Sequence, residues 1–79
     1  MPTILRLFGF VFFFYSHEHE PPHIHVEGKG GYAKYEWNGT TFVLKEVVNV
    51  KKADIKNISG VIDDNADLIL QSWNNYFSK

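Results

Sequence analysis

An α+β domain is what the sequence predicts: an antiparallel sheet of four to five strands, with one or two C-terminal helices packed on one of its faces. Short apolar and alternating runs, separated by turn residues, fill the first 46 positions, and apolar residues recur at helical spacing from position 55 onward. The chain has 79 residues, which suit one domain and not two. We therefore expect residues 1–79 to form a single domain, with the sheet in 1–46 and the helical part in 50–78.

The first two expected strands are joined by a tight turn. Ile4–Leu7 is a short strand, Phe8-Gly9 turns the chain because glycine tolerates positive φ, and Phe10–Tyr15 is the second strand. Two consecutive prolines in Ser16–Pro22 remove two backbone donors. This segment is therefore expected to be irregular.

Two further hairpins are predicted after the prolines. His23–Glu27 is the third strand, Gly28–Gly31 a four-residue turn and Tyr32–Trp37 the fourth strand. Asn38-Gly39 is typical of a two-residue type I′ turn. Thr40–Leu44 is therefore expected to be the fifth strand.

The C-terminal third changes to a helical period. Seven apolar residues recur at three- and four-residue intervals and would line one helical face: Ile55, Ile58, Ile62, Ala66, Ile69, Trp73 and Phe77. Asp63-Asp64-Asn65 interrupts this stripe, and Asn65 could cap a second helix with Asp67 in its first turn. One bent helix and two helices both fit, and the stripe is expected to be core.

Hairpin register sorts the side chains of the last three strands into two faces. The predicted pairs are Glu27 with Tyr32, His25 with Lys34, His23 with Glu36, Trp37 with Thr40, Glu36 with Thr41 and Lys34 with Val43. Because side chains alternate along a strand, the core face would carry Ile24, Val26, Ala33, Tyr35, Trp37, Phe42 and Leu44. The polar face would carry His23, His25, Glu27, Tyr32, Lys34 and Glu36.

The side chains of the second strand do not divide into an apolar and a polar face. Phe10–Tyr15 is apolar on both sides, and two short helices cover only one face of a sheet. The other side needs a second chain, or the strand is central under a folded-back loop. We expect a homodimer or a small cognate protein partner bound through Phe10–Tyr15.

Composition excludes several classes of protein. The net charge is −1, which is not the basic excess of a protein that binds nucleic acid by bulk charge, although Lys51, Lys52 and Lys56 could form a local basic patch. No cysteine is present, so disulfides, thiolate chemistry and Cys-based zinc sites are excluded. The apolar run in residues 7–15 is too short to cross a bilayer and has no signal-peptide cleavage site. A cytoplasmic protein without membrane contact is expected.

All four histidines, at positions 17, 19, 23 and 25, fall within nine residues. His23 and His25 are two apart on a predicted strand, so their rings project the same way. In a first interpretation they bind a divalent metal, since His-x-His near a carboxylate suits zinc or non-haem iron. His19 or Glu27 could serve as a further ligand. No other cofactor is indicated, and His17 has nothing to orient it.

Two other interpretations of the histidines stay open. His23 and His25 could act as acid and base on a phosphodiester, because histidine titrates near neutral pH. That requires both rings to be accessible on one face. The rest of such a site would be Lys34 for the phosphate and Glu36, with Arg6 and Tyr32 binding the substrate. In the last interpretation the histidines are structural and organise a loop or an interface.

Several segments resemble an uncharacterised bacterial domain-of-unknown-function family (DUF "forty-one sixty"), whose pattern is M-P-T-I followed by an Arg, a Gly and then H-x-P-P-H-x-H. Here the matching residues are Met1 to Ile4, Arg6, Gly9, His19, Pro21, Pro22, His23 and His25. Leu68–Trp73 resembles the closing helix of that family with its Trp. The resemblance covers essentially the whole chain, and His17 falls outside the motif.

The resemblance implies a small bacterial cytoplasmic protein and no established activity. Genes of this family often lie beside a second small gene, of a family thought to include DNA-binding proteins, and such pairs have been proposed as toxin–antitoxin modules. The leading hypothesis from the sequence is therefore a toxin-like protein that acts on RNA through its histidine cluster. The alternative is a non-catalytic module that binds a protein or a metal and has structural histidines.

Overall fold

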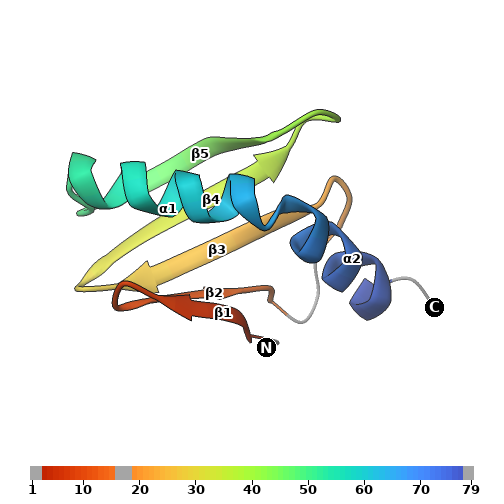
Figure 1. Ribbon diagram of the computed structural model, residues 1–79, viewed down its shortest axis with the longest axis horizontal. Helices are drawn as coiled ribbons and strands as arrows, with labels where there is room; N and C mark the ends of the chain where they lie inside the picture. The colour runs from red at the N-terminus through yellow and green to blue at the C-terminus, as the bar shows by residue number, and fades with distance from the viewer. Residues whose placement is uncertain (1–2, 16–18, 78–79) are drawn as a thin grey trace.

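The computed structural model describes residues 3–15 and 19–77. Its elements are β1 (Thr3–Leu7), β2 (Phe10–Phe13), β3 (His23–Gly28), β4 (Gly31–Trp37), β5 (Phe42–Val48), α1 (Lys52–Asp64) and α2 (Ala66–Phe77). The strands form one antiparallel sheet in sequence order, and the helices follow (Figure 1). The predicted α+β class is confirmed. Met1, His17 and Glu18 lie outside the described residues.

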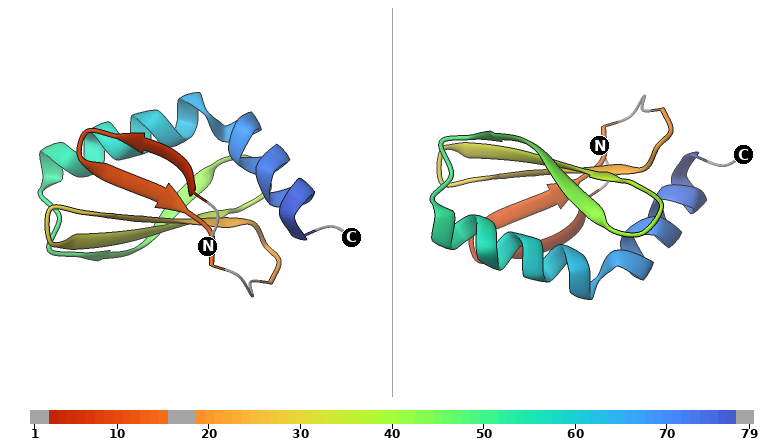
Figure 2. Two further views of the ribbon diagram at one scale, coloured as in Figure 1. Left: turned by 90° about the horizontal axis from the view of Figure 1, so that it is seen from below. Right: turned by 90° about the horizontal axis from the view of Figure 1, so that it is seen from above.

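Both helices lie on the same side of a strongly twisted sheet, and neither covers its other face (Figure 2). The core fills the space between these two layers. Its members come from four strands, the end of β2 and both helices: Phe10, Phe12, Phe14, Ile24, Val26, Ala33, Tyr35, Phe42, Ile58, Ile62, Ile69 and Trp73. Burying each large apolar side chain contributes roughly 1.5–3 kcal/mol, so this single core supplies the main stabilisation.

The helical part consists of two helices that meet at Asn65. The backbone N–H of Asn65 donates to Val61 and Ile62, and its carbonyl accepts the first bond of α2 from Ile69 at 2.9 Å. The Asn65 side chain does not cap α2, because its Nδ2 donates back to the Val61 carbonyl at 2.8 Å. In residues 3–15 and 19–77, neither helix has the length and apolar character needed to span a membrane.

Two tight turns have the backbone of type I′. Phe8 and Gly9 have φ of 55° and 80°, and Lys29 and Gly30 have φ of 52° and 77°. Positive φ at both central residues suits the twist of a hairpin. The predicted turn at Phe8-Gly9 is confirmed. The predicted pairing of the third and fourth strands is confirmed too, although the turn itself has two residues inside the Gly28–Gly31 pair.

The prediction of a type I′ turn at Asn38-Gly39 is wrong. Trp37 pairs with Phe42, so residues 38–41 form a four-residue loop. The Asn38 side chain causes this widening, since its Oδ1 accepts the backbone N–H of both Thr40 and Thr41 at 2.9 Å. A shift of two residues keeps every side chain on its face, and Phe42 therefore still packs in the core.

The far part of β5 pairs differently from the prediction because the strand is bulged. Lys34 pairs with Glu46 and Tyr35 with Leu44, which leaves Lys45 as the extra residue. The expected partner of Lys34, Val43, instead pairs with Glu36. The other edge strand, β1, also has an irregular register between Thr3 and Leu5. Bulges on both edges disfavour edge-to-edge association of sheets.

Gly28 is required where the first two hairpins approach each other. A Cβ atom at Gly28 would lie 2.3 Å from the carbonyl oxygen of Gly9, which is backbone and cannot swing away. We expect Gly28→Ala to lower the free energy of unfolding by about 2 kcal/mol or more, measured by urea denaturation. Gly60→Ala is the control, because a Cβ there meets nothing within 4 Å and should add about 0.5–1 kcal/mol of stability to helix α1. Equal effects of the two substitutions would contradict this packing.

Tyr35 joins the sheet to α1. Because its phenol is buried, the free energy of unfolding should fall at alkaline pH. Its hydroxyl is 2.6 Å from the Ser59 hydroxyl. Burial raises the pKa of the Tyr35 phenol, the bond to Ser59 partly opposes this, and the charge of Asp63 adds to it. The unfolded phenol therefore ionises first, near pH 10, and the native state loses stability as pH rises further.

Tyr35→Phe tests this linkage. At pH 7 the substitution should lower the free energy of unfolding by about 1 kcal/mol, the usual net value of one hydrogen bond. Above about pH 10 the difference between the two proteins should shrink, because only the wild type must keep a buried phenol protonated. Tyr76→Phe, at an exposed position, is the control. A difference that stays constant from neutral to alkaline pH would refute the argument.

Candidate functional site

The sheet face that the helices leave uncovered, called the open face below, carries three rows of paired residues. The first row is Arg6, Val11, Glu27, Tyr32 and Val48. The second row is Thr3, Phe13, His25, Lys34 and Glu46. The third row is His23, Glu36 and Val43. Paired residues of neighbouring strands project to the same side, so these rows place the polar residues of five strands on one surface.

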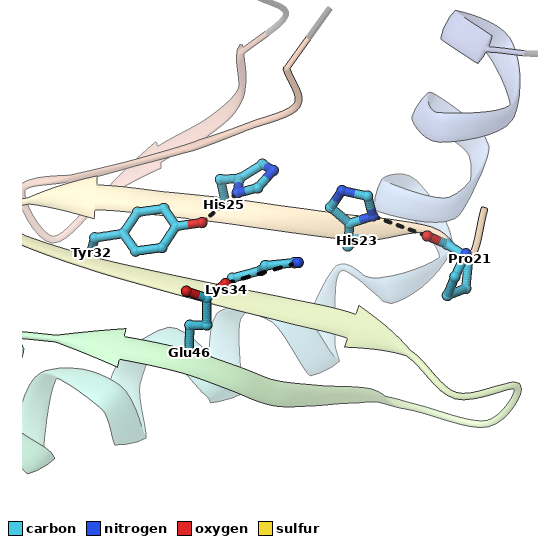
Figure 3. Close-up of polar contacts among 6 residues, drawn as sticks. All are labelled: Pro21, His23, His25, Tyr32, Lys34 and Glu46. Atoms are coloured by element: carbon cyan, nitrogen blue, oxygen red, sulfur yellow. Dashed lines mark hydrogen bonds and ion pairs between the residues drawn. The ribbon is translucent and has the colours of Figure 1, made fainter. Parts of the chain in front are cut away.

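The four residues predicted to be catalytic lie together on β3 and β4. His23 pairs with Glu36, and His25 pairs with Lys34. The Lys34 ammonium is also 3.9 Å from the Glu46 carboxylate (Figure 3). The register argument from the sequence thus locates these side chains correctly as neighbours.

The two residues predicted to bind substrate are farther apart. Arg6 lies on β1 and Tyr32 on β4, with β2 and β3 between them. Both line a shallow depression of about 660 Å³ on the open face, whose walls include Val11, Phe13 and Glu27. Neighbouring strands are about 4.8 Å apart, so one small ligand would have to extend across the sheet to touch both.

His25 is buried, which contradicts the expectation that both histidines of the strand are accessible. Only 4% of its surface is exposed. Its Nδ1 is 2.7 Å from the Tyr32 hydroxyl, and its ring lies 4.2 Å from the Tyr15 ring and 5.5 Å from Phe13 between centroids. A general acid or base must reach the substrate within hydrogen-bonding distance. The aromatic rings over His25 prevent that.

The same cluster covers one apolar side of β2. Phe13 projects to the open face, yet only 1% of it is exposed. The rings of Tyr15 and His25 lie 5.3 and 5.5 Å from it. Of the open-face side chains in Phe10–Tyr15, the chain therefore buries Phe13 by itself, while Tyr15 stays exposed.

His23 is half-buried and is oriented by the proline segment. Its Nδ1 lies 3.0 Å from the Pro21 carbonyl oxygen (Figure 3). A carbonyl only accepts, so His23 carries a proton on Nδ1. Its ring lies 5.0 Å from the Trp73 ring and 5.2 Å from the His25 ring. His23 thus links the open face to the last helix.

The segment before β3 is tied to three elements. The Trp73 indole N–H, from α2, donates to the Glu20 carboxylate at 2.9 Å. The Trp37 backbone N–H, from β4, donates to the Pro22 carbonyl at 2.8 Å. With the bond between Pro21 and His23, each position of Glu20–His23 contacts another part of the structure. We call these contacts the proline staple.

The sequence did not reveal the role of Glu20. Its partner Trp73 is 53 positions away, and no local pattern relates a loop carboxylate to an indole that distant. The sequence did show two prolines directly after Glu20 and a Trp near the C-terminus. Neither feature indicated that Glu20 and Trp73 are in contact.

His19 is an exposed residue before the prolines. Among residues 3–15 and 19–77, no three His, Cys, Asp or Glu side chains are gathered closely enough to hold a metal ion. The proposed set of His19, His23 and His25 is therefore not brought together in this arrangement. A metal at these residues would require them to rearrange.

These features define a small α+β domain with a five-stranded meander, two covering helices and a staple built from its Pro-Pro-His motif. Comparison with protein families matches residues 9–74 to a domain of unknown function, DUF4160. The chain belongs to this family. No curated protein and no solved structure matches it. Family membership thus supplies no activity, and function has to be argued from the residues.

The His25–Tyr32 hydrogen bond can be tested by removing one hydroxyl. We expect Tyr32→Phe to lower the free energy of unfolding by about 1–2 kcal/mol, because it leaves a polar ring nitrogen of buried His25 without this partner. Chemical denaturation measures the change. A matched substitution at the exposed Tyr76, Tyr76→Phe, should change it by less than about 0.5 kcal/mol. Indistinguishable results for the two would show that this bond contributes nothing.

Proposed function

We propose that this protein is a non-catalytic protein-binding module whose histidines are structural. The observation that carries the proposal is the proline staple together with the burial of His25. His23 contacts Pro21 and the Trp73 ring, and His25 contacts Tyr32 under two other aromatic rings. Histidines that stabilise the fold in this way are unsuited to proton transfer, since each turnover would have to break their hydrogen bonds and ring contacts.

The fold offers a physical reason for such histidines. A chain of this size buries only about 60% of its unfolded surface and has a marginal core. Stacked rings with a polar edge let the open face bury apolar area and still satisfy hydrogen bonds. Histidine suits a position between Phe13 and the Tyr32 hydroxyl for this reason.

The partner we propose is the small protein encoded beside members of this family, in a two-gene module of the toxin–antitoxin type in the bacterial cytoplasm. The two proteins of such a pair must bind each other, and this requires no catalysis. A second copy of this chain is the competing partner, and sedimentation of the purified protein separates the two. Both edge strands are bulged, which favours a partner that does not extend the sheet.

One observation favours a second candidate, action on RNA. His23 and Glu36 are cross-strand neighbours, and Lys34 lies in the next row. An imidazole and a carboxylate side by side, with a cation for the phosphate, are the minimum for acid–base cleavage of a phosphodiester. In this version His25 supports His23 and does not exchange protons with the substrate.

His23→Ala separates the two candidates. As a binding module the wild type should leave single-stranded RNA intact, and the substitution should lower the free energy of unfolding by about 1–2 kcal/mol through lost packing on Trp73. If RNA is the substrate, the wild type cleaves it, and both His23→Ala and Glu36→Gln slow cleavage by about 10²–10⁴-fold. Lys45→Ala, at an exposed position of β5, is the control.

The outcome that contradicts the binding module is RNA cleavage that His23→Ala abolishes without any loss of stability. A thermal scan with a chelator tests the metal alternative in the same experiment. We expect no change in Tm, and a drop on chelation would show that a metal supports the fold.

A further inference from the structure

One end of the molecule gathers both tight turns, the end of β5 and the start of α1, and we call it the turn end (Figure 1). Its parts are in contact. A Cβ at Gly9 would lie 3.1 Å from the Lys29 side chain, and the Asn49 amide donates to the Gly30 carbonyl at 3.1 Å. Lys29 also pairs with Asp54 in the first turn of α1 at 3.6 Å. The turn end is therefore a connected surface.

Large apolar side chains are exposed at the turn end. Eight large apolar residues of the described chain are exposed, and four of them lie at this end: Leu7, Phe8, Val47 and Val48. Val47 lines the helix side of the sheet, and Val48 projects to the open face. Phe8 is 55% exposed and Val48 59%. Apolar residues gathered at one place on a small domain indicate a surface that is covered by something else.

Phe8 has an unfavourable backbone conformation, and no contact within the described part of the fold compensates for it. Its φ of 55° is in the left-handed region, which costs a bulky residue roughly 1–2 kcal/mol and suits glycine or asparagine. Its ring packs into no core, since it is mostly exposed. Neither backbone nor packing explains a phenylalanine here. A contact outside the chain would explain it.

Positive charge gathers where α1 begins. Lys51, Lys52 and Lys56 are exposed, and none forms an ion pair with a residue in the described ranges. The nearest acidic partner, Asp54, is paired with Lys29. The opposite sign collects where the two helices meet, at Asp63, Asp64 and Asp67. A near-neutral protein is thus polarised along its helices.

A hollow of about 600 Å³ opens at the turn end between the sheet and α1. Phe10, Val47 and Val50 give it apolar walls, and its charged lining residues are Lys29, Lys51 and Asp54. Because Asp54 pairs with Lys29, the net positive charge of the lining comes from Lys51. Its size suits one or two apolar side chains. Its chemistry suits a partner with a bulky apolar residue and negative charge around it.

We propose that the turn end binds an acidic protein segment that inserts an apolar side chain into this hollow, and the proposal rests on the function proposed above. Carboxylates of the segment would face Lys51, Lys52 and Lys56, and Phe8 would pack on its backbone or side chains. A symmetric contact between the turn ends of two copies is disfavoured, since two lysine-rich ends repel each other. A lipid surface would not use the hollow.

Selection of peptides tests the proposal without knowledge of the natural partner. Random short peptides displayed on phage are selected on the purified full-length protein, and we expect the enriched ones to be acidic and to contain Leu, Phe or Trp. The binding of one such peptide should weaken about tenfold or more in Phe8→Asn and in the double variant Lys51→Glu/Lys52→Glu. Lys45→Glu, an exposed lysine of β5 outside the turn end, should bind normally.

Phe8→Asn also gives a readout that separates binding from folding. Asparagine tolerates positive φ, so this variant should be as stable as the wild type or more stable. Loss of peptide binding in a protein of unchanged stability then reports the contact alone. Loss of binding together with a lower unfolding midpoint would contradict the proposal.

The other possible outcomes would each contradict the proposal for the turn end. Enrichment of neutral or basic peptides, or NMR shift changes confined to the open face around His23, would overturn the turn end as the site and leave a protein-binding function standing. Recovery of no peptide overturns the proposal, and RNA cleavage dependent on His23 would overturn the proposed function too. Binding to phosphatidylglycerol vesicles, with no peptide selected, would show that an anionic membrane is the occupant.

Discussion

The hydrogen bond from the Trp73 indole to the Glu20 carboxylate joins the last helix to the segment that leads into the central strand. The orientation of His23 depends on this connection. It fixes Pro21 and Pro22, whose carbonyls hold the His23 ring and the Trp37 backbone. The staple acts across the end of the sheet, where a short meander would otherwise fray. Helix, loop and two strands are thus held by three hydrogen bonds and a stack of rings.

A consequence of the staple is that the histidines lie at the junction between two packing environments. His23 contacts Trp73, whose other side packs on Phe14 and Phe77 within the helix layer. His25 continues the contacts toward Phe13 on the open face. Rings are therefore in contact from α2 to the far side of the sheet. Hydrogen bonds of His23, His25 and Trp73 accompany these ring contacts, so polar atoms of the three rings have partners within the fold.

The structural contacts and the proposed binding surface are separated along the molecule. The staple, the open-face histidines and the helix junction lie toward one end, and the turns with exposed Phe8 and the lysines lie at the other (Figure 1). The first region carries the three hydrogen bonds of the proline staple. The second has a strained backbone and exposed apolar surface, both of which cost stability. Such a division is typical of a domain whose fold presents one surface to a partner.

The sequence by itself determined the order of elements, the α+β class and the residues that share each face. These properties follow from alternation and from the 3.6-residue period, which are local. Even the wrong turn at Asn38-Gly39 left Phe42 on the core side, because a shift of two residues does not change a side chain's face. The neighbourhood of His23, His25, Lys34 and Glu36 was predicted for the same reason.

Only the tertiary structure decided how buried these residues are and what they contact. His25 is covered because rings of β2, β3 and β4 converge on it, and no pattern within one strand carries that information. The Glu20 and Trp73 pair, the bulge at Lys45 and the contact of Gly9 with Lys29 join parts of the chain that are distant or set in a particular register. Local sequence specifies the direction in which a side chain points. The packing of separate elements specifies what it meets there.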